Sequence, residues 1–188
     1  VVNLTMFVEG YYLSAGTMNS VRFNQDGVSP TDEVEVMTVN LHDATTYALV
    51  DTATGTLKTD GTLSVTFNTA AAGSYYVAVK GVNMIETWSA DPLAVGAAPL
   101  SYDFSSAATQ AYGSNMTEIE PGVFAMYQGD LNGDGGVDNT DGDTLFFDID
   151  NFAFGVLATD LTGDGGADNS DGDILLRNAD NFIAISRP

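Results

Sequence analysis

The sequence predicts a mainly β protein in two parts: a β-sandwich over residues 1–128 and a small module of two loop–helix repeats over residues 129–188. In the first part, short stretches of alternating apolar and polar residues are separated by turn signals, a pattern typical of a sandwich. The second part contains one acidic, glycine-rich segment twice, starting at Asp130 and at Asp160. The 26 acidic residues divide equally between residues 1–129 and 130–188, so the shorter second part is more than twice as dense in acidic side chains.

Strands are expected in order along the first part. Residues 2–8 and 62–67 carry an apolar residue at every second position, which is the period of a half-buried strand. Within residues 34–41 the apolar residues fall out of phase after Val36, which predicts a bulge. Asp60-Gly61, just before the strand expected at residues 62–67, is a hairpin turn signal.

Two further strands are expected at residues 75–79 and 123–127. Between them, the stretch from Asp91-Pro92 to Pro99 interrupts the pattern, so it is either a loop or a shift between sheets. The segment 72–79, in which Gly73 precedes Tyr75, resembles a late strand of immunoglobulin- and fibronectin-type domains. This resemblance implies an immunoglobulin-like sandwich.

The repeated segment has the spacing of a calcium loop. Each copy places oxygen-bearing side chains at loop positions 1, 3, 5, 9 and 12 and a glycine at position 6, as in an EF-hand. The carbonyl oxygen of position 7 completes the expected shell. The expected Ca²⁺ ligands are Asp130, Asn132, Asp134, Gly136, Asp138 and Asp141 in the first loop, and Asp160, Thr162, Asp164, Gly166, Asp168 and Asp171 in the second.

A loop that binds nothing is a poor alternative, because four carboxylates in one short segment repel one another unless a cation lies between them. The sequence therefore predicts two calcium sites with a structural role. Thr162 replaces the asparagine of position 3, so the second site is expected to have the weaker ligand there.

The pair of loops resembles the dockerin-type calcium repeat, in which Asp closes the loop and a short helix follows. The resemblance covers residues 129–188 and implies a helix starting near Asp141 in the first repeat. The apolar stripes expected on the two helices are Leu145, Ile149 and Phe152, and Leu175, Ala179 and Phe182. Gly142 and Gly172 depart from a good helix start, since glycine costs about 1 kcal/mol relative to alanine.

Docking to a cohesin partner is the function that the dockerin resemblance implies. The positions where dockerins of enzymes carry basic recognition residues hold other residues here: Phe146 and Phe147, then Leu176 and Arg177. The calcium fold therefore carries over from the resemblance, whereas docking to a cohesin does not. Phe146, Phe147 and Phe154 are apolar residues beyond what the helices need, so they either pack on the sandwich or contact a partner.

The composition excludes several classes of protein. A net charge of −21 argues against a nucleic-acid partner, which requires clustered Lys and Arg. The absence of cysteine excludes disulfides and thiolate sites, and no apolar run is long enough to span a membrane. The chain opens at Val1 without a signal peptide. Each of the two loop–helix repeats ends in an Asn-Phe pair, Asn151-Phe152 and Asn181-Phe182, and a sandwich followed by two such repeats resembles C-terminal regions of secreted surface proteins of certain Gram-negative bacteria. An exported, mature, extracellular protein is expected.

No enzyme is expected. The only histidine, His42, lies beside Asp43, but the chain has no nucleophile elbow. Glu33 and Glu35 alternate on what is expected to be an exposed strand face. Four aromatic residues could either stack on sugar rings or belong to the core: Tyr11, Tyr12, Trp88 and Tyr102.

Three functions of different classes remain open on the sequence. The favoured one is a calcium-stabilised extracellular structural subunit that self-associates into a bacterial surface fibre or array, with the apolar residues 2–8 as an edge strand that pairs with another subunit. The alternatives are a dockerin-type module that docks to a cohesin-like protein partner, and a carbohydrate-binding sandwich with structural calcium.

Overall fold

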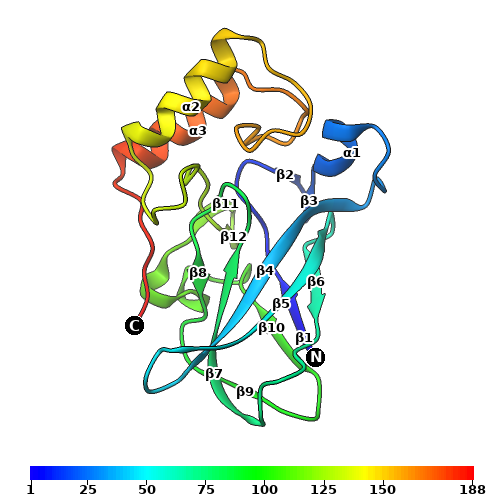
Figure 1. Ribbon diagram of the computed structural model, residues 1–188, viewed down its shortest axis with the longest axis vertical. Helices are drawn as coiled ribbons and strands as arrows, with labels where there is room; N and C mark the ends of the chain where they lie inside the picture. Colours follow the sequence, from blue (N-terminus) through cyan, green and yellow to red (C-terminus); the bar gives the residue numbers. More distant parts are fainter.

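The structure, a computed structural model, describes residues 1–188. Strands fill one end of the molecule, and two helices lie side by side at the other end (Figure 1). One sheet has the strand order β5-β4-β7-β8 with β9 also paired to β7, and a second sheet has the order β10-β1-β6. The mainly β fold with two C-terminal helices is therefore confirmed.

The first sheet contains β4 (Glu33–Asp43), β5 (Leu49–Lys58), β7 (Gly73–Lys80), β8 (Thr87–Trp88) and β9 (Leu93–Val95). The second sheet contains β1 (Val2–Thr5), β6 (Thr62–Val65) and β10 (Leu100–Asp103). Two ribbons pair β2 (Tyr12–Ser14) with β3 (Thr17–Met18) and β11 (Thr117–Glu120) with β12 (Val123–Ala125). The helices are α1 (Val21–Asp26), α2 (Asn139–Asp150) and α3 (Asn169–Asp180), with 3₁₀ turns at Ala108–Gln110 and Tyr112–Ser114. None of the helices combines the length and apolar character that a membrane crossing requires.

The main core lies between the two sheets, because the alternating strands direct one set of side chains inward. Fully buried members include Leu4, Met37, Leu41 and Phe104. The strand expected at residues 75–79 is β7, and the Tyr75 hydroxyl donates to the Ala71 carbonyl at 2.9 Å, as a corner tyrosine does.

The N-terminal strand β1 lies in the middle of its sheet. It pairs antiparallel with β6 and parallel with β10, and the side chains of Val2, Leu4, Met6 and Val8 are buried. The expectation that residues 2–8 form an edge strand for another subunit is wrong, because this chain's own strands occupy both hydrogen-bonding edges of β1.

Two turns connect the sheets. Asp60-Gly61 is a turn, as expected, with Gly61 at φ +82°, but it leads from β5 in one sheet to β6 in the other and closes no hairpin ladder. After β9 on the first sheet, the chain passes through Pro99 to β10 on the second. The interruption at residues 91–99 is thus a shift between sheets.

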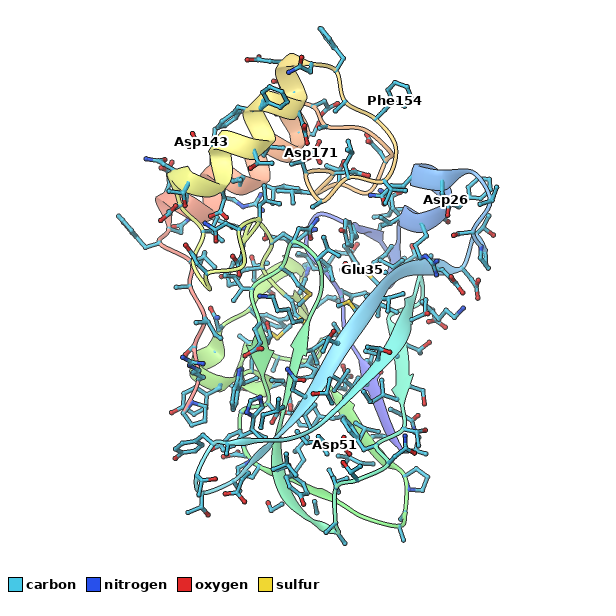
Figure 2. The ribbon with its side chains drawn as sticks, in the orientation of Figure 1. Asp26, Glu35, Asp51, Asp143, Phe154 and Asp171 are labelled. Carbon is cyan, nitrogen blue, oxygen red and sulfur yellow. The ribbon has the colours of Figure 1, made fainter.

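The bulge in β4 lies earlier than expected, between Glu33 and Glu35. Val34 and Glu35 both turn inward as a result, and Val36 is exposed. The expectation of an exposed face is wrong for Glu35, which is only 8% exposed. One oxygen of its carboxylate accepts from the Val82 amide and the other has no partner, and burial raises the pKa of Glu35 to about 7 (Figure 2).

Glu35→Gln is expected to stabilise the protein at pH 8. The raised pKa means that the neutral carboxyl is favoured in the folded state, so its contribution to stability is complete below pH 4.5 and lost as the pH rises through about 7. The shift corresponds to about 3 kcal/mol, and the amide variant carries no such penalty. Urea unfolding should show the gain at pH 8 and none at pH 4. The exposed Glu118→Gln is the control, and equal stability of Glu35→Gln and the parent at pH 8 would contradict this prediction.

The helical pair joins the sandwich through a second buried cluster and a polar network. Ile85 of the sandwich packs with Leu145, Leu161 and Leu175. Apolar side chains from residues 1–128 and from residues 129–188 share this cluster. The boundary between two domains at residues 128 and 129 therefore stays a prediction.

The polar network centres on the buried carboxylate of Glu9. It accepts hydrogen bonds from the Gln128 amide at 2.8 Å and the Arg177 guanidinium at 2.6 Å, and one from the side chain of Asn178. Asn178 also donates to the Gln128 carbonyl at 2.8 Å. Together these bonds fix α3 against the sandwich.

Candidate calcium loops and helical face

Each of the helices α2 and α3 begins directly from a repeated loop. Asp138 and Asp168, at loop position 9, are the N-cap residues, and each forms a capping box with the aspartate of position 12. Two backbone N–H groups that a helix start leaves unpaired are thus satisfied in each repeat. This compensates for the glycine that follows position 12 in each repeat.

Those glycines have a packing role. A Cβ added at Gly142 would lie 3.0 Å from the ring of Phe146 and 3.8 Å from Leu175, and one at Gly172 would lie 3.4 Å from Phe146. The contacts across the helix pair, Gly142 to Leu175 and Gly172 to Phe146, are at ordinary van der Waals distance, and the tight one is between Gly142 and Phe146 within α2. Both glycines therefore lie in the contact between the two helices.

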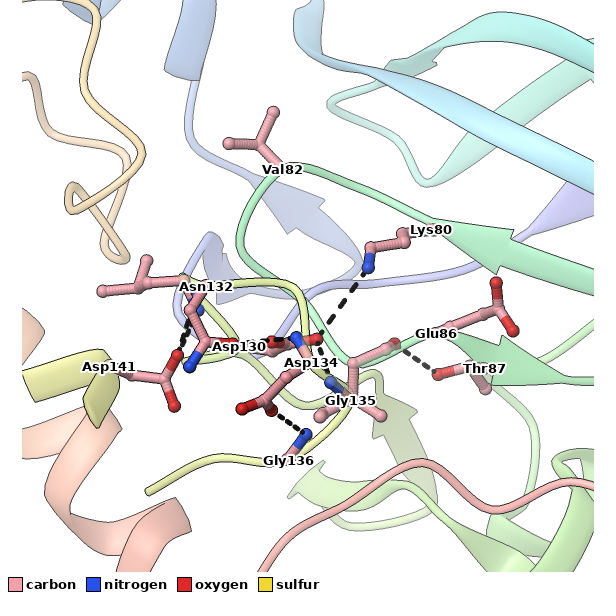
Figure 3. A network of polar contacts seen from close by, with 12 residues as sticks. Lys80, Val82, Glu86, Thr87, Asp130, Asn132, Asp134, Gly135, Gly136 and Asp141 are labelled. Atoms are coloured by element: carbon pink, nitrogen blue, oxygen red, sulfur yellow. Dashed lines mark hydrogen bonds and ion pairs between the residues drawn. The ribbon is translucent and has the colours of Figure 1, made fainter. Parts of the chain in front are cut away.

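In the first loop, the carboxylates of positions 1 and 12, Asp130 and Asp141, are buried. Figure 3 draws both with the groups around them. The Oδ1 atom of Asp141 accepts from the amides of Leu131 and Asn132 at 2.8 and 3.0 Å. The Oδ2 atom of Asp130 accepts from the Gly135 amide at 3.2 Å and lies 3.9 Å from the Lys80 ammonium. The Oδ1 atom of Asp130 has no hydrogen-bond partner although it is buried.

The second loop repeats this arrangement. Asp160 Oδ1 accepts from the Gly163 amide at 2.8 Å, and its Oδ2 accepts from the Gln25 side chain at 2.9 Å. Asp171 Oδ1 accepts from the Thr162 amide at 2.7 Å. Burial raises the pKa values of Asp160 and Asp171, as it does that of Asp130 in the first loop.

The remaining expected side-chain ligands, at positions 3, 5 and 9, are more exposed and engaged locally. Asn132 Oδ1 accepts from the Asp134 amide at 2.8 Å, and Asp134 Oδ1 accepts from the Gly136 amide at 3.0 Å. Asp164 makes the equivalent bond to Gly166 at 3.2 Å. Asp138 Oδ1 binds the amide and hydroxyl of Thr140, both at 2.7 Å, and these bonds lower its pKa. No three acidic or histidine side chains converge on one cation position.

The loops are paired across the repeat by short β-bridges. Gly136 bridges to Ala184 and Phe154 bridges to Gly166, so each loop pairs with the segment that follows the other repeat's helix. In the first loop, Gly135 and Val137 bond residues 183–185 through backbone groups, while no hydrogen bond uses the carbonyl of Gly136. The carbonyl of Gly166 is equally unpaired. The position 7 oxygens are therefore available as ligands.

These residues fit a calcium ion in their donor chemistry. Every expected donor is an oxygen, the ligand type that Ca²⁺ prefers. The buried, unpartnered Oδ1 of Asp130 and the unpaired position 7 carbonyls each lack a partner that a cation would supply. The assignment of the twelve ligands remains a prediction.

The outer face of the helical pair carries exposed aromatic side chains. Phe147 on α2 is 67% exposed, and Phe152 and Phe182, which follow the two helices, are 86% and 88% exposed. Phe154 projects from the segment after α2 (Figure 2). The stripes expected to include Phe152 and Phe182 are wrong at these residues, because both helices end before them and each adopts a positive φ.

The other sequence candidates lie elsewhere. His42 stacks on Trp88 with ring centroids 4.1 Å apart, and Trp88 and Tyr11 are buried. Tyr102 lines an open groove of about 660 Å³ on the β10-β1-β6 sheet, but its hydroxyl bonds the Gln110 carbonyl at 2.6 Å. These aromatics form no exposed stacking platform, which weakens the carbohydrate-binding alternative.

Sequence reasoning missed Lys80 and Gln25, which approach the first residues of the two loops from the sandwich. They lie 50 and 135 residues from their partners, and no local motif marks them. It also missed the ion pair between Arg177 and Glu9, because only the fold brings the segment after β1 to α3.

No family model matches the sequence, and no curated protein matches it. The fold, in contrast, matches chains of two crystal structures of a type II Cohesin-X-Dockerin complex from Acetivibrio cellulolyticus. One is an N-terminal interface mutant, with a TM-score of 0.52 at 15% identity over 97% of this chain and 100% of that chain. The other is a C-terminal interface mutant, with a TM-score of 0.53 at 15% identity over 96% and 98%.

This chain has the fold of an X-module with its dockerin. The match extends the resemblance seen in residues 129–188 to nearly the whole chain. At 15% identity it is the fold that is shared. In the matched structures, the X-dockerin unit is part of a complex with a cohesin, and no catalytic module is named.

Proposed function

We propose that this chain is a non-catalytic, extracellular docking module whose calcium-bound helical pair binds a cohesin-like protein partner. The observation that carries the proposal is the match of nearly the whole chain to the X-dockerin fold together with an exposed aromatic face on its helical pair. The self-assembling fibre is less well supported, because the strand expected to join subunits is buried in its own sheet.

Calcium has a structural role in this proposal. When bound, it would neutralise carboxylates that the loops bury, and so hold the start of each helix. Asp130, Asp141, Asp160 and Asp171 are the buried candidates, with the exposed side chains of positions 3, 5 and 9 and the position 7 carbonyls completing each shell. The orientation of α2 and α3, and hence of their outer face, would then depend on the ions.

The outer face suits a protein partner. Exposed Phe and Leu side chains from both helices share the surface with carboxylates such as Asp143 and Asp173. Aromatic residues in contact with a partner account for much of the affinity in protein interfaces. The acidic residues around them favour a partner with a basic rim, because complementary charges speed association and select the partner.

Phe147→Ser and Leu176→Ser are expected to weaken binding to a cohesin by at least tenfold each. The measurement is biolayer interferometry against a panel of purified cohesins that includes the type II cohesin of the matched complex. Both residues lie on the outer face, so their loss removes apolar contact area without opening the core.

Val28→Ser is the matched control, because Val28 is an exposed aliphatic residue outside α2 and α3, in the segment between α1 and β4. It should leave binding unchanged. The proposal predicts that at least one cohesin binds, that chelator abolishes binding, and that only the helical variants weaken it. If no cohesin in the panel binds, or if Val28→Ser and Phe147→Ser act alike, docking through this face is wrong.

A further inference from the structure

We propose that the sandwich gives the two loops different calcium affinities, with Lys80 weakening the first loop and Gln25 supporting the second. The inference rests on the proposed calcium binding and concerns how the rest of the chain adjusts it. The loops are near-copies, and their own residues predict a slightly weaker second site, because Thr162 takes the place that Asn132 has in the first loop. The two groups that reach them from the sandwich differ in charge.

The equivalent carboxylates of position 1 have different neighbours. Asp130 Oδ2 has the ammonium of Lys80, at the end of β7, at 3.9 Å (Figure 3). Asp160 Oδ2 instead accepts from the neutral amide of Gln25, on α1, at 2.9 Å. Lys80 also lies over the first loop, since its ammonium would be 3.6 Å from a Cβ at Gly133.

A fixed ammonium beside a cation site lowers the affinity for calcium. It repels the divalent ion and partly neutralises Asp130, the carboxylate that the ion would use. Glu86 and Arg187 line the same cavity of about 200 Å³ and carry opposite charges, so Lys80 adds one excess positive charge to the groups that face the loop's own carboxylates, Asp130 and Asp134. The expected effect is a roughly tenfold weaker first site, because the Lys80 side chain is partly exposed and water screens much of its repulsion of the ion.

The second loop is also better preorganised. Asn19 donates to the Thr162 carbonyl at 2.7 Å, and Asn24 donates to the Gly163 carbonyl at 2.8 Å. With Gln25, three amide side chains from the region of α1 hold this loop in place. A loop that is already ordered loses less entropy on binding. The second loop therefore takes calcium first, which reverses the order expected from Thr162.

Calcium titration of the chelator-stripped full chain tests the inference. The amide signals of Gly135 and Gly165 in a ¹⁵N–¹H spectrum report on the two loops separately, and calorimetry gives the affinities. Gly165 should respond first. Lys80→Gln should raise the affinity of the first loop about tenfold and leave the second unchanged, whereas Lys80→Arg should retain the weak first site. Gln25→Lys should lower the affinity of the second loop about tenfold.

Lys58→Gln is the matched control, because it removes the same charge from a lysine whose partners are Asp32 and Glu33. The inference is overturned if Gly135 responds first, or if Lys80→Gln changes the first loop no more than Lys58→Gln does. If neither glycine responds to calcium, the proposed calcium binding itself fails, which is a different result.

Discussion

Excess chelator is expected to lower the melting temperature of this protein by roughly 10 °C or more. A ligand that binds only the folded state stabilises it by about 4 kcal/mol when its concentration is 1,000 times its Kd. Two occupied sites would together stabilise the protein by more than almost any single substitution changes its free energy of unfolding. For a chain of this size, 1 kcal/mol of that free energy shifts the melting temperature by about 2–4 °C. Calorimetry in millimolar calcium and in chelator measures the difference.

Asp164→Ala separates calcium binding from general effects of the chelator. This exposed carboxylate at position 5 bonds only the Gly166 amide, so its removal costs little without calcium. The variant should melt lower than the parent in calcium and at the same temperature in chelator. Asp180→Ala, an exposed aspartate at the end of α3, should match the parent in both. A melting temperature of the parent that chelator leaves unchanged would contradict the structural role of calcium.

Leu4→Ala is expected to destabilise the protein by about 2–5 kcal/mol, the usual cost of truncating a fully buried leucine. Leu4 lies in the central strand of the second sheet, opposite Leu63 and beside Tyr102. Urea unfolding measures the loss, and Leu13→Ala, at an exposed leucine of β2, should cost less than about 0.5 kcal/mol.

Deleting residues 1–9 should therefore give a chain that does not fold. That outcome follows from β1 belonging to its own core, and it also removes Glu9 from the junction with α3. A deleted chain that remains folded as a monomer would show that β1 is dispensable and would restore the original expectation of an assembly strand.

The parts of the fold that local patterns encode could be predicted from the sequence. Alternation located β1 and β6, the repeated spacing located both loops, and the dockerin resemblance placed the start of α2 to within a few residues. The predictions that were wrong concern residues whose partners lie far away in the sequence. The apolar residues 2–8 look the same whether they pair within the chain or with another subunit. Only the pairing with residues 62–65 and 100–103 decides between the two.

The same limit applies to single residues. Glu35 reads as an exposed strand residue because the bulge that turns it inward has no signal of its own at residues 33–35. Phe152 fits a helical stripe by spacing, but the helix ends at Asp150 and the chain turns it outward. At the loops, the ligand types could be predicted from their spacing, whereas Lys80 and Gln25 could not, since tertiary contacts alone bring them there.

Hydrogen–deuterium exchange of the calcium-loaded chain, with and without a cohesin that binds it, tests most directly whether the helical pair is the docking surface. The expected result is slower exchange within residues 139–154 and 169–182 on binding, with β1, β6 and β10 unchanged. Protection confined to the β10-β1-β6 sheet, with α2 and α3 unaffected, would contradict docking through the helical pair.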